Sequence, residues 1–154
     1  MHSERSSGPG RYSEADYPEQ RLSGLVMSSA YAIHRAFGYG FLESVYRRAL
    51  TVELNHQGTE VRQEVPFALA HRGVPVGSYR ADMVVGGRII VEVKTGLLPD
   101  PVAAPQLLNY LSASGLEVGL VLHFGPDLQI KRVVRSRKLA EIPADPRARS
   151  TTRP

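Results

Sequence analysis

The sequence predicts an α/β domain in which a mixed β-sheet is flanked by helices, with the element order ααβββαββ. Two amphipathic stretches with apolar residues every three to four positions come first. Alternating or continuous apolar runs separated by glycine turns follow, and one more helical stretch interrupts them. A sheet with helices packed against it is the layer arrangement that buries such elements.

The first helix is predicted by an apolar stripe from Leu22 to Phe37, and Gly38-Tyr39-Gly40 ends it. The second helix carries its apolar face from Leu42 to Leu54 and stops near Gly58. Apolar and polar residues alternate from residue 61 to residue 69, which predicts a half-buried strand. Pro66 favours an edge position or a bulge for this strand.

The second strand is expected over about residues 74–85 and the third over 88–95, joined by Gly86-Gly87. A helix lies within residues 100–115. It is predicted to start at Ala104 or Pro105, because proline disrupts a helix interior, and to be capped by Gly115. Residues 117–124 and 128–134 complete the order as two strands.

The composition is that of one globular domain, with 154 residues, 42% apolar and 22% charged. Residues 17–135 are expected to fold, and the polar segments 1–16 and 136–154 to form flexible tails. The net charge of +4 suits a polyanionic partner such as nucleic acid, and the C-terminal tail is basic. The absence of cysteine excludes disulfides and thiolate chemistry. With no secretory signal or membrane span in the sequence, a cytoplasmic location without membrane contact is expected.

The third strand contains Glu92 and Lys94 within an otherwise apolar run. Strand side chains alternate, so both residues project to one face. Buried charges are rare unless they are paired or hold a metal ion, and a structural Glu92–Lys94 ion pair is one interpretation.

Asp82 on the preceding strand favours the other interpretation. A two-residue turn would place Asp82 and Glu92 on opposite faces, whereas a three-residue loop with a glycine-type bulge pairs them. We predict that bulged loop, or an equivalent distortion near Asp82, because Gly86-Gly87 supplies positive φ angles. Two facing carboxylates then imply a cation between them.

Glu43, at the start of the second helix, is the third candidate acid, although the helix dipole alone also favours glutamate there. Three carboxylates and one ammonium group leave a charge of −2, which one divalent cation matches. Oxygen ligands without cysteine favour Mg²⁺ or Mn²⁺. Gln106 and Tyr110 lie one turn apart on the third helix, where Gln106 either hydrogen-bonds a phosphate or a metal-bound water or is a polar residue near the helix start. Arg80 is either a phosphate contact or an ordinary surface residue.

The segment from Gly40 to Tyr46, GFLESVY, is similar to the signature of the GxxExxY protein family, a branch of the PD-(D/E)XK nuclease superfamily. The resemblance covers about Leu22 to Val134 and continues through these segments: Tyr79-Arg80-Ala81-Asp82, Ile90-Val91-Glu92-Val93-Lys94, Gln106-Leu107-Leu108-Asn109-Tyr110-Leu111 and Gly119-Leu120-Val121-Leu122-His123-Phe124-Gly125.

This resemblance implies a restriction-endonuclease-like core and a Mg²⁺- or Mn²⁺-dependent phosphodiesterase site. The implied roles are Asp82, Glu92, Val93 and Glu43 at the metal, Lys94 and Gln106 assisting catalysis, and Arg80 and Tyr110 at the nucleic acid. Two positions differ from family members, which often have histidine where this chain has Ala103 and asparagine where it has His123.

Three functional hypotheses follow. The first is a nuclease that hydrolyses nucleic acid, with DNA as the expected substrate, by a metal-activated water. The second is a catalytically weak or inactive nuclease-fold module that binds nucleic acid or protein. The third is a structural protein in which Glu92 and Lys94 only pair with each other. A second copy of the chain, forming a homodimer, is a further candidate partner.

Overall fold

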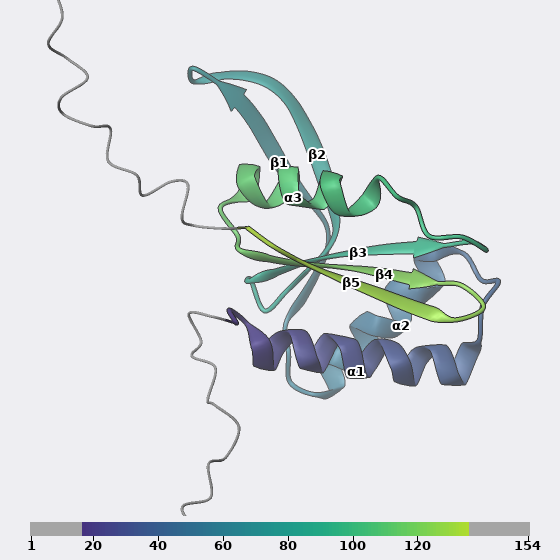
Figure 1. Ribbon diagram of the computed structural model, residues 1–154. Helices are drawn as coiled ribbons and strands as arrows, with labels where there is room; N and C mark the ends of the chain where they lie inside the picture. Colours follow the sequence, from purple (N-terminus) through teal and green to yellow (C-terminus); the bar gives the residue numbers. More distant parts are fainter. Residues whose placement is uncertain (1–16, 136–154) are drawn as a thin grey trace, which may run out of the picture.

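The structure, a computed structural model, describes residues 17–135; both segments expected to be tails, 1–16 and 136–154, lie outside the described residues. The predicted order ααβββαββ is confirmed (Figure 1). The elements are α1 (Gln20–Phe37), α2 (Glu43–His56), β1 (Val61–His71), β2 (Val74–Val85), β3 (Ile89–Thr95), α3 (Ala103–Ser114), β4 (Val118–Phe124) and β5 (Leu128–Val134). No helix within residues 17–135 is long and apolar enough to span a membrane.

The five strands form one mixed sheet in the order β1-β2-β3-β4-β5. Neighbouring strands are antiparallel except β3 and β4, which are parallel. A parallel pair needs a crossover connection, and α3 provides it. Helices α1 and α2 cover one face of the sheet and α3 covers the other (Figure 1). The predicted mixed sheet between helices is therefore confirmed.

Two apolar clusters hold these layers together. One joins α1 and α2 to side chains such as Val91 and Val93 of β3, and the other joins α3 to Ile90 of the same strand. Strand β3 is thus buried on both faces, as its continuous apolar run predicts. Gly119 on β4 permits the close approach of α3, because a Cβ atom there would lie 2.7–2.9 Å from carbons of Leu107.

The start of α3 differs from the prediction. The helix begins at Ala103 rather than at Ala104 or Pro105, so Pro105 is its third residue. The first N–H groups of a helix have no partner within the helix, and proline at this position therefore removes no intrahelical bond. The buried stripe of α3 is confined to Ala103, Leu107 and Leu111, and Leu108 is 42% exposed. The predicted cap Gly115 is confirmed, with φ of 77°.

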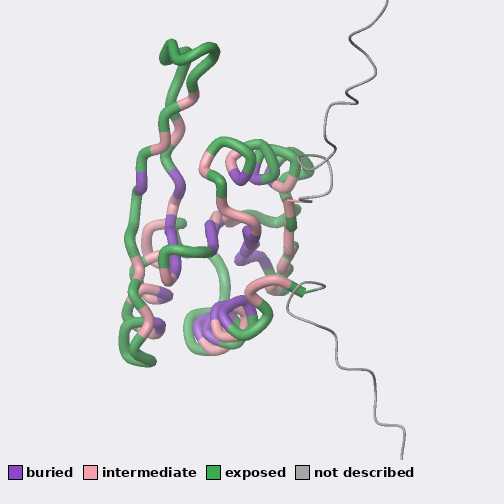
Figure 2. The backbone as a smooth tube through the Cα atoms, turned by 90° about the vertical axis from the view of Figure 1, so that its left-hand side faces the viewer, coloured by how far each residue is buried: buried purple, intermediate pink, exposed green. Residues whose placement is uncertain are grey.

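The hairpin of β1 and β2 bends sharply where Glu64 lies opposite Asp82. Glu64 has a φ of 51°, in the left-handed region, which interrupts the regular strand. Val61 packs with the α1–α2 cluster, whereas Val65 and Phe67 beyond the bend pack with the α3 cluster. Beyond it, residues 65–81 form a two-stranded ribbon, here called the arm, which extends past α3 (Figures 1 and 2). β1 is an edge strand, as Pro66 predicts.

Candidate active site

The turn between β2 and β3 sets the register on which the site depends. Val85 pairs with Ile89 and Met83 with Val91, so the loop contains three residues, Gly86 to Arg88. Gly86 and Gly87 have φ angles of 59° and 66°. The predicted three-residue loop is therefore present, and one further step along this register brings Asp82 opposite Glu92.

Asp82 is held at the edge of β3 by a backbone contact. The β2–β3 pairing ends at Met83 and Val91, and Oδ2 of Asp82 accepts a hydrogen bond of 2.8 Å from the N–H of Val93. The carboxylate thus takes the place of β2 backbone as the partner of β3. Because the N–H and C=O groups of a strand residue face the same edge, the Val93 carbonyl also faces the side on which Asp82 lies.

The Glu92 carboxyl is largely buried beside Asp82. Its Oε1 atom is inaccessible and has no hydrogen-bond partner among the described residues. Burial is the main cause that raises the pKa of Glu92 to about 8, followed by repulsion from the neighbouring Asp82 carboxylate. A buried acid without compensation is costly, so this carboxyl pair favours either a shared proton or an added cation.

Arg47 on α2 is a site residue that the sequence analysis missed. Its Nη1 atom lies 3.7 Å from Oδ1 of Asp82 and 3.9 Å from Oε1 of Glu64. The predicted charge of the site included Lys94 as the sole positive group, and the guanidinium of Arg47 adds a second positive charge beside Asp82. The signal was available, since Arg47 is four residues after Glu43 and therefore shares its helix face.

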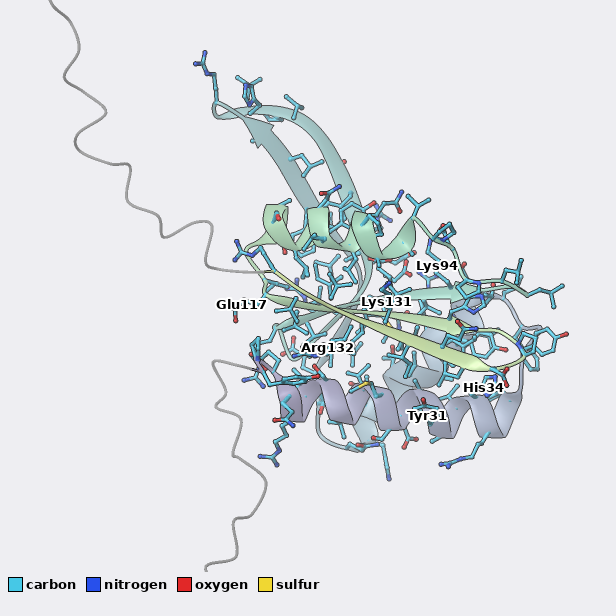
Figure 3. All side chains as sticks on the ribbon, viewed as in Figure 1. Tyr31, His34, Lys94, Glu117, Lys131 and Arg132 are labelled. Carbon is cyan, nitrogen blue, oxygen red and sulfur yellow. The ribbon has the colours of Figure 1, made fainter. Side chains whose placement is uncertain are left out.

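Lys94 lies on the α3 side of β3, close to the beginning of α3 (Figure 3). It shares the face of Glu92, because the two residues are two positions apart on a strand. Within residues 17–135, no carboxylate lies within the 4.0 Å ion-pair distance of its ammonium group. Its positive charge still lowers the pKa of Glu92, as the weakest of the effects acting on that carboxyl. Among the described residues, no ion pair therefore prevents the ammonium group from contacting a ligand.

Glu43 does not complete a cluster of three acids. It is the first residue of α2, is exposed, and lines a hollow of about 590 Å³ with Thr95, Gly96 and Leu97 at the end of β3. Among the described residues, no group of three histidine or acidic side chains is close enough to hold a metal ion. The expected convergence of Glu43 with Asp82 and Glu92 is not present in this structure, because the beginning of α2 lies beyond the carboxyl pair along β3.

Gln106 is exposed in the first turns of α3, and Tyr110 lies one turn later. Tyr110 stacks on Tyr79 of β2 with ring centres 3.8 Å apart, and Tyr79 stacks in turn on Phe67 of β1 at 5.1 Å. The Tyr79 hydroxyl donates a 2.9 Å hydrogen bond to the Tyr110 carbonyl, and burial raises the pKa of Tyr79 to about 12. Arg80 is exposed on the arm. This three-ring stack joins the arm to α3, and no local pattern predicts it because its rings come from three elements.

His123 is the register partner of Lys94 on β4. It is only 3% exposed, and neither ring nitrogen has a hydrogen-bond partner among the described residues. Its ring packs against Gly125, where a Cβ atom would lie 2.8 Å from Cε1 of His123. The histidine that differs from the family pattern thus lies beside the candidate catalytic lysine.

The motif from Gly40 to Tyr46 has a structural explanation of its own. Gly40 has a φ of 109°, which residues with a Cβ atom rarely adopt. Tyr46 is fully buried, donates a 2.8 Å hydrogen bond to the Gly38 carbonyl, and stacks on Phe124 with ring centres 4.3 Å apart. These two residues fix the α1–α2 connection and the position of α2 on the sheet.

A family model described as the PD-(D/E)XK nuclease superfamily matches residues 20–134. The chain belongs to the PD-(D/E)XK nuclease superfamily. Its mixed sheet flanked by helices is the restriction-endonuclease-like fold of the superfamily. No curated protein matches the sequence significantly. Among solved structures, the one titled "Crystal structure of SSO0001" is similar with a TM-score of 0.48 and 21% identity, over 82% of this chain and 64% of that one. This chain therefore spans less than two thirds of that protein.

Members of the PD-(D/E)XK superfamily are usually phosphodiesterases that use divalent metal ions. The residues present fit such an ion. The donors are carboxylate and carbonyl oxygens, which Mg²⁺ and Mn²⁺ prefer, and Oε1 of Glu92 is a buried acceptor without a partner. A cation at this position would also relieve the repulsion that raises the pKa of Glu92.

Proposed function

We propose that this chain is a Mg²⁺- or Mn²⁺-dependent nuclease that hydrolyses phosphodiester bonds of DNA. The single observation that carries the proposal is the partly buried Asp82–Glu92 carboxyl pair on the face that also carries Lys94, in which Oε1 of Glu92 is inaccessible and has no partner among the described residues. A structural ion pair would instead require the Lys94 ammonium group within 4.0 Å of the Glu92 carboxylate, and the two groups are further apart than this.

The proposed ion would be held by Asp82, Glu92 and the carbonyl of Val93, with Glu43 as an accessory acid that would have to approach from α2. When bound, a divalent cation supplies positive charge at the phosphate and lowers the pKa of the water it coordinates. The N–H of Val93 and the guanidinium of Arg47 hold Asp82 in a fixed orientation.

Lys94 is the proposed catalytic cation. Its ammonium group would donate hydrogen bonds to the phosphate oxygens, on which negative charge increases in the transition state. Gln106 would donate to a phosphate oxygen from the exposed start of α3, and Arg80 and Tyr110 would contact the backbone on either side. The GxxExxY assignment belongs to the same proposal, and the structural roles of Gly40 and Tyr46 support it.

The test is cleavage of supercoiled and linear DNA, and of RNA, by the purified protein with Mg²⁺ or Mn²⁺. We expect Lys94→Ala to lower the cleavage rate at least 100-fold while the protein remains folded. Lys131→Ala, which removes an exposed lysine on β5, is the matched control and should cleave like the wild type. Absence of cleavage by the wild type with both metals and both polymers would refute the nuclease proposal.

The Arg47–Asp82 contact favours one alternative, a binding module with weak or no catalysis, because Arg47 already supplies part of the countercharge that a metal ion would provide. Calorimetric titration with Mn²⁺ separates the two. The nuclease requires binding that Asp82→Asn and Glu92→Gln abolish. The module requires nucleic-acid or protein binding that a chelator does not change.

A further inference from the structure

Among residues 17–135, the two strands of the arm, residues 65–81, pair only with each other. The backbone pairing of β2 with β3 is limited to Met83 to Val85, so beyond the bend the ribbon continues without a third paired strand. Most of the arm is exposed along its length (Figure 2). The six residue steps from Val65 to His71 correspond to a reach of about 20 Å from the bend.

The direction of the arm is fixed near its base. Tyr79 is stacked between Phe67 on the other strand of the arm and Tyr110 on α3. Its hydroxyl donates to the Tyr110 carbonyl, so both packing and a hydrogen bond join the ribbon to the helix. Aromatic pairs of this kind contribute about 0.5–1.5 kcal/mol each beyond the burial of their area. The arm is therefore a positioned element rather than a freely moving loop.

The charges on the arm have one sign. No acidic residue occurs between Val65 and Ala81, whereas Arg72 and Arg80 are both exposed and His71 lies at the tip. Val74 and Val76, also near the tip, are 61% and 68% exposed. The nearest acids, Glu64 and Asp82, lie at the bend. An acid-free cationic ribbon that begins at the carboxyl pair is complementary to a polyanion passing over that pair.

We propose that the arm lies in the major groove of duplex DNA and fixes the duplex beside the carboxyl pair; this inference rests on the proposed function. The major groove of B-form DNA is about 12 Å wide and admits a two-stranded ribbon, whereas the major groove of A-form RNA is too narrow. At about 3.4 Å per base pair, a reach of about 20 Å corresponds to roughly six base pairs on one side of the cleaved bond.

The test is the affinity of a 30-base-pair DNA duplex, measured by fluorescence anisotropy in chelator at several salt concentrations. The arm variant is Arg72→Glu with Arg80→Glu, and the matched control is Arg21→Glu with Arg35→Glu, two exposed arginines on α1. We expect the arm variant to bind at least 10-fold more weakly. Its slope of log Kd against log salt should flatten by about 2, because two phosphate contacts are lost. The control should change Kd less than twofold.

Nuclease footprinting adds a geometric measure. The wild-type footprint should extend roughly six base pairs further on one side than that of the arm variant, and duplex RNA should bind at least 10-fold more weakly than duplex DNA. The substituted side chains are exposed, so the melting temperatures should agree with that of the wild type, which shows that the fold is retained. A second variant, Val74→Glu with Val76→Glu, tests the tip without removing an arginine and should also weaken DNA binding.

Equal loss of affinity in arm and control variants would overturn the inference, as would equal affinity for duplex RNA. Sedimentation that shows a dimer dependent on Val74 and Val76, with unchanged DNA binding, would assign the arm to a second copy of the chain and also overturn it. If the wild type cleaves DNA but the arm variant binds normally, the inference and the proposed Arg80 contact fail, whereas the proposed metal-dependent cleavage stands. If the wild type never cleaves but the arm variant loses binding, the inference stands and the nuclease proposal fails.

Discussion

Replacing Glu92 by glutamine should stabilise the metal-free protein at alkaline pH. The pKa of Glu92 is raised in the folded protein to about 8, chiefly by burial and then by Asp82, and its ordinary value is 4.5. The folded state therefore holds more protons than the unfolded state between these values, so stability falls as the pH rises through that window. At about 1.36 kcal/mol per pKa unit, the full loss is at most about 5 kcal/mol above pH 8.

The assay is urea unfolding in chelator at pH 5 and at pH 9, for wild type and Glu92→Gln. Glutamine keeps the shape of the side chain and cannot ionise, so the variant should be within about 1 kcal/mol of the wild type at pH 5 and several kcal/mol more stable at pH 9. Millimolar Mn²⁺ should raise the stability of the wild type alone, because ion binding stabilises the folded state. A difference between the proteins that does not depend on pH would refute the argument that Glu92 is a buried, protonatable partner of Asp82.

Two further predictions concern packing. Gly119→Ala should destabilise the fold by about 1–3 kcal/mol in urea unfolding, because the new methyl group meets Leu107 at 2.7–2.9 Å. The control Gly24→Ala in α1, where a new methyl group meets nothing within 4 Å, should be neutral or stabilising. A larger loss of stability in Gly24→Ala than in Gly119→Ala would contradict the close approach of α3. Tyr79→Leu should cost about 2–4 kcal/mol and speed amide exchange in the arm, whereas Tyr79→Phe, which loses only the hydroxyl bond to Tyr110, should cost about 1 kcal/mol. Equal effects of the two substitutions would show that the ring stack does not hold the arm.

Local sequence patterns predicted the order of the helices and strands and the register between β2 and β3. The turn at Gly86-Gly87 and the cap at Gly115 depend on positive φ angles that glycine supplies, so the residues themselves carry the information. The pairing of Asp82 with Glu92 follows from the length of that turn, and the buried strand β3 follows from its apolar run. These are short-range effects, and sequence reasoning is strongest there.

Tertiary packing decided the rest. Arg47 meets Asp82 because of the way α2 packs against β1 and β3, and the same placement leaves Glu43 beside the end of β3 rather than at the carboxyl pair. The bend at Glu64 puts a non-glycine residue in the left-handed region, which no local rule anticipates. The sequence pattern therefore predicted that Asp82 and Glu92 lie close together, but it did not predict that Arg47 rather than Glu43 lies beside Asp82.

The outer edge of β1 has a further consequence for the behaviour of the chain at high concentration. An open edge strand invites another strand to add to the sheet, which is a common route to aggregation. Here the reversed backbone angle at Glu64, the proline at position 66 and the register shift after Leu69 divide that edge into short pieces. An incoming strand would find no regular run of hydrogen-bonding groups along it. The backbone irregularity at Glu64, which sets the direction of the arm, thus also hinders the addition of a strand from another copy of the chain to the edge of β1.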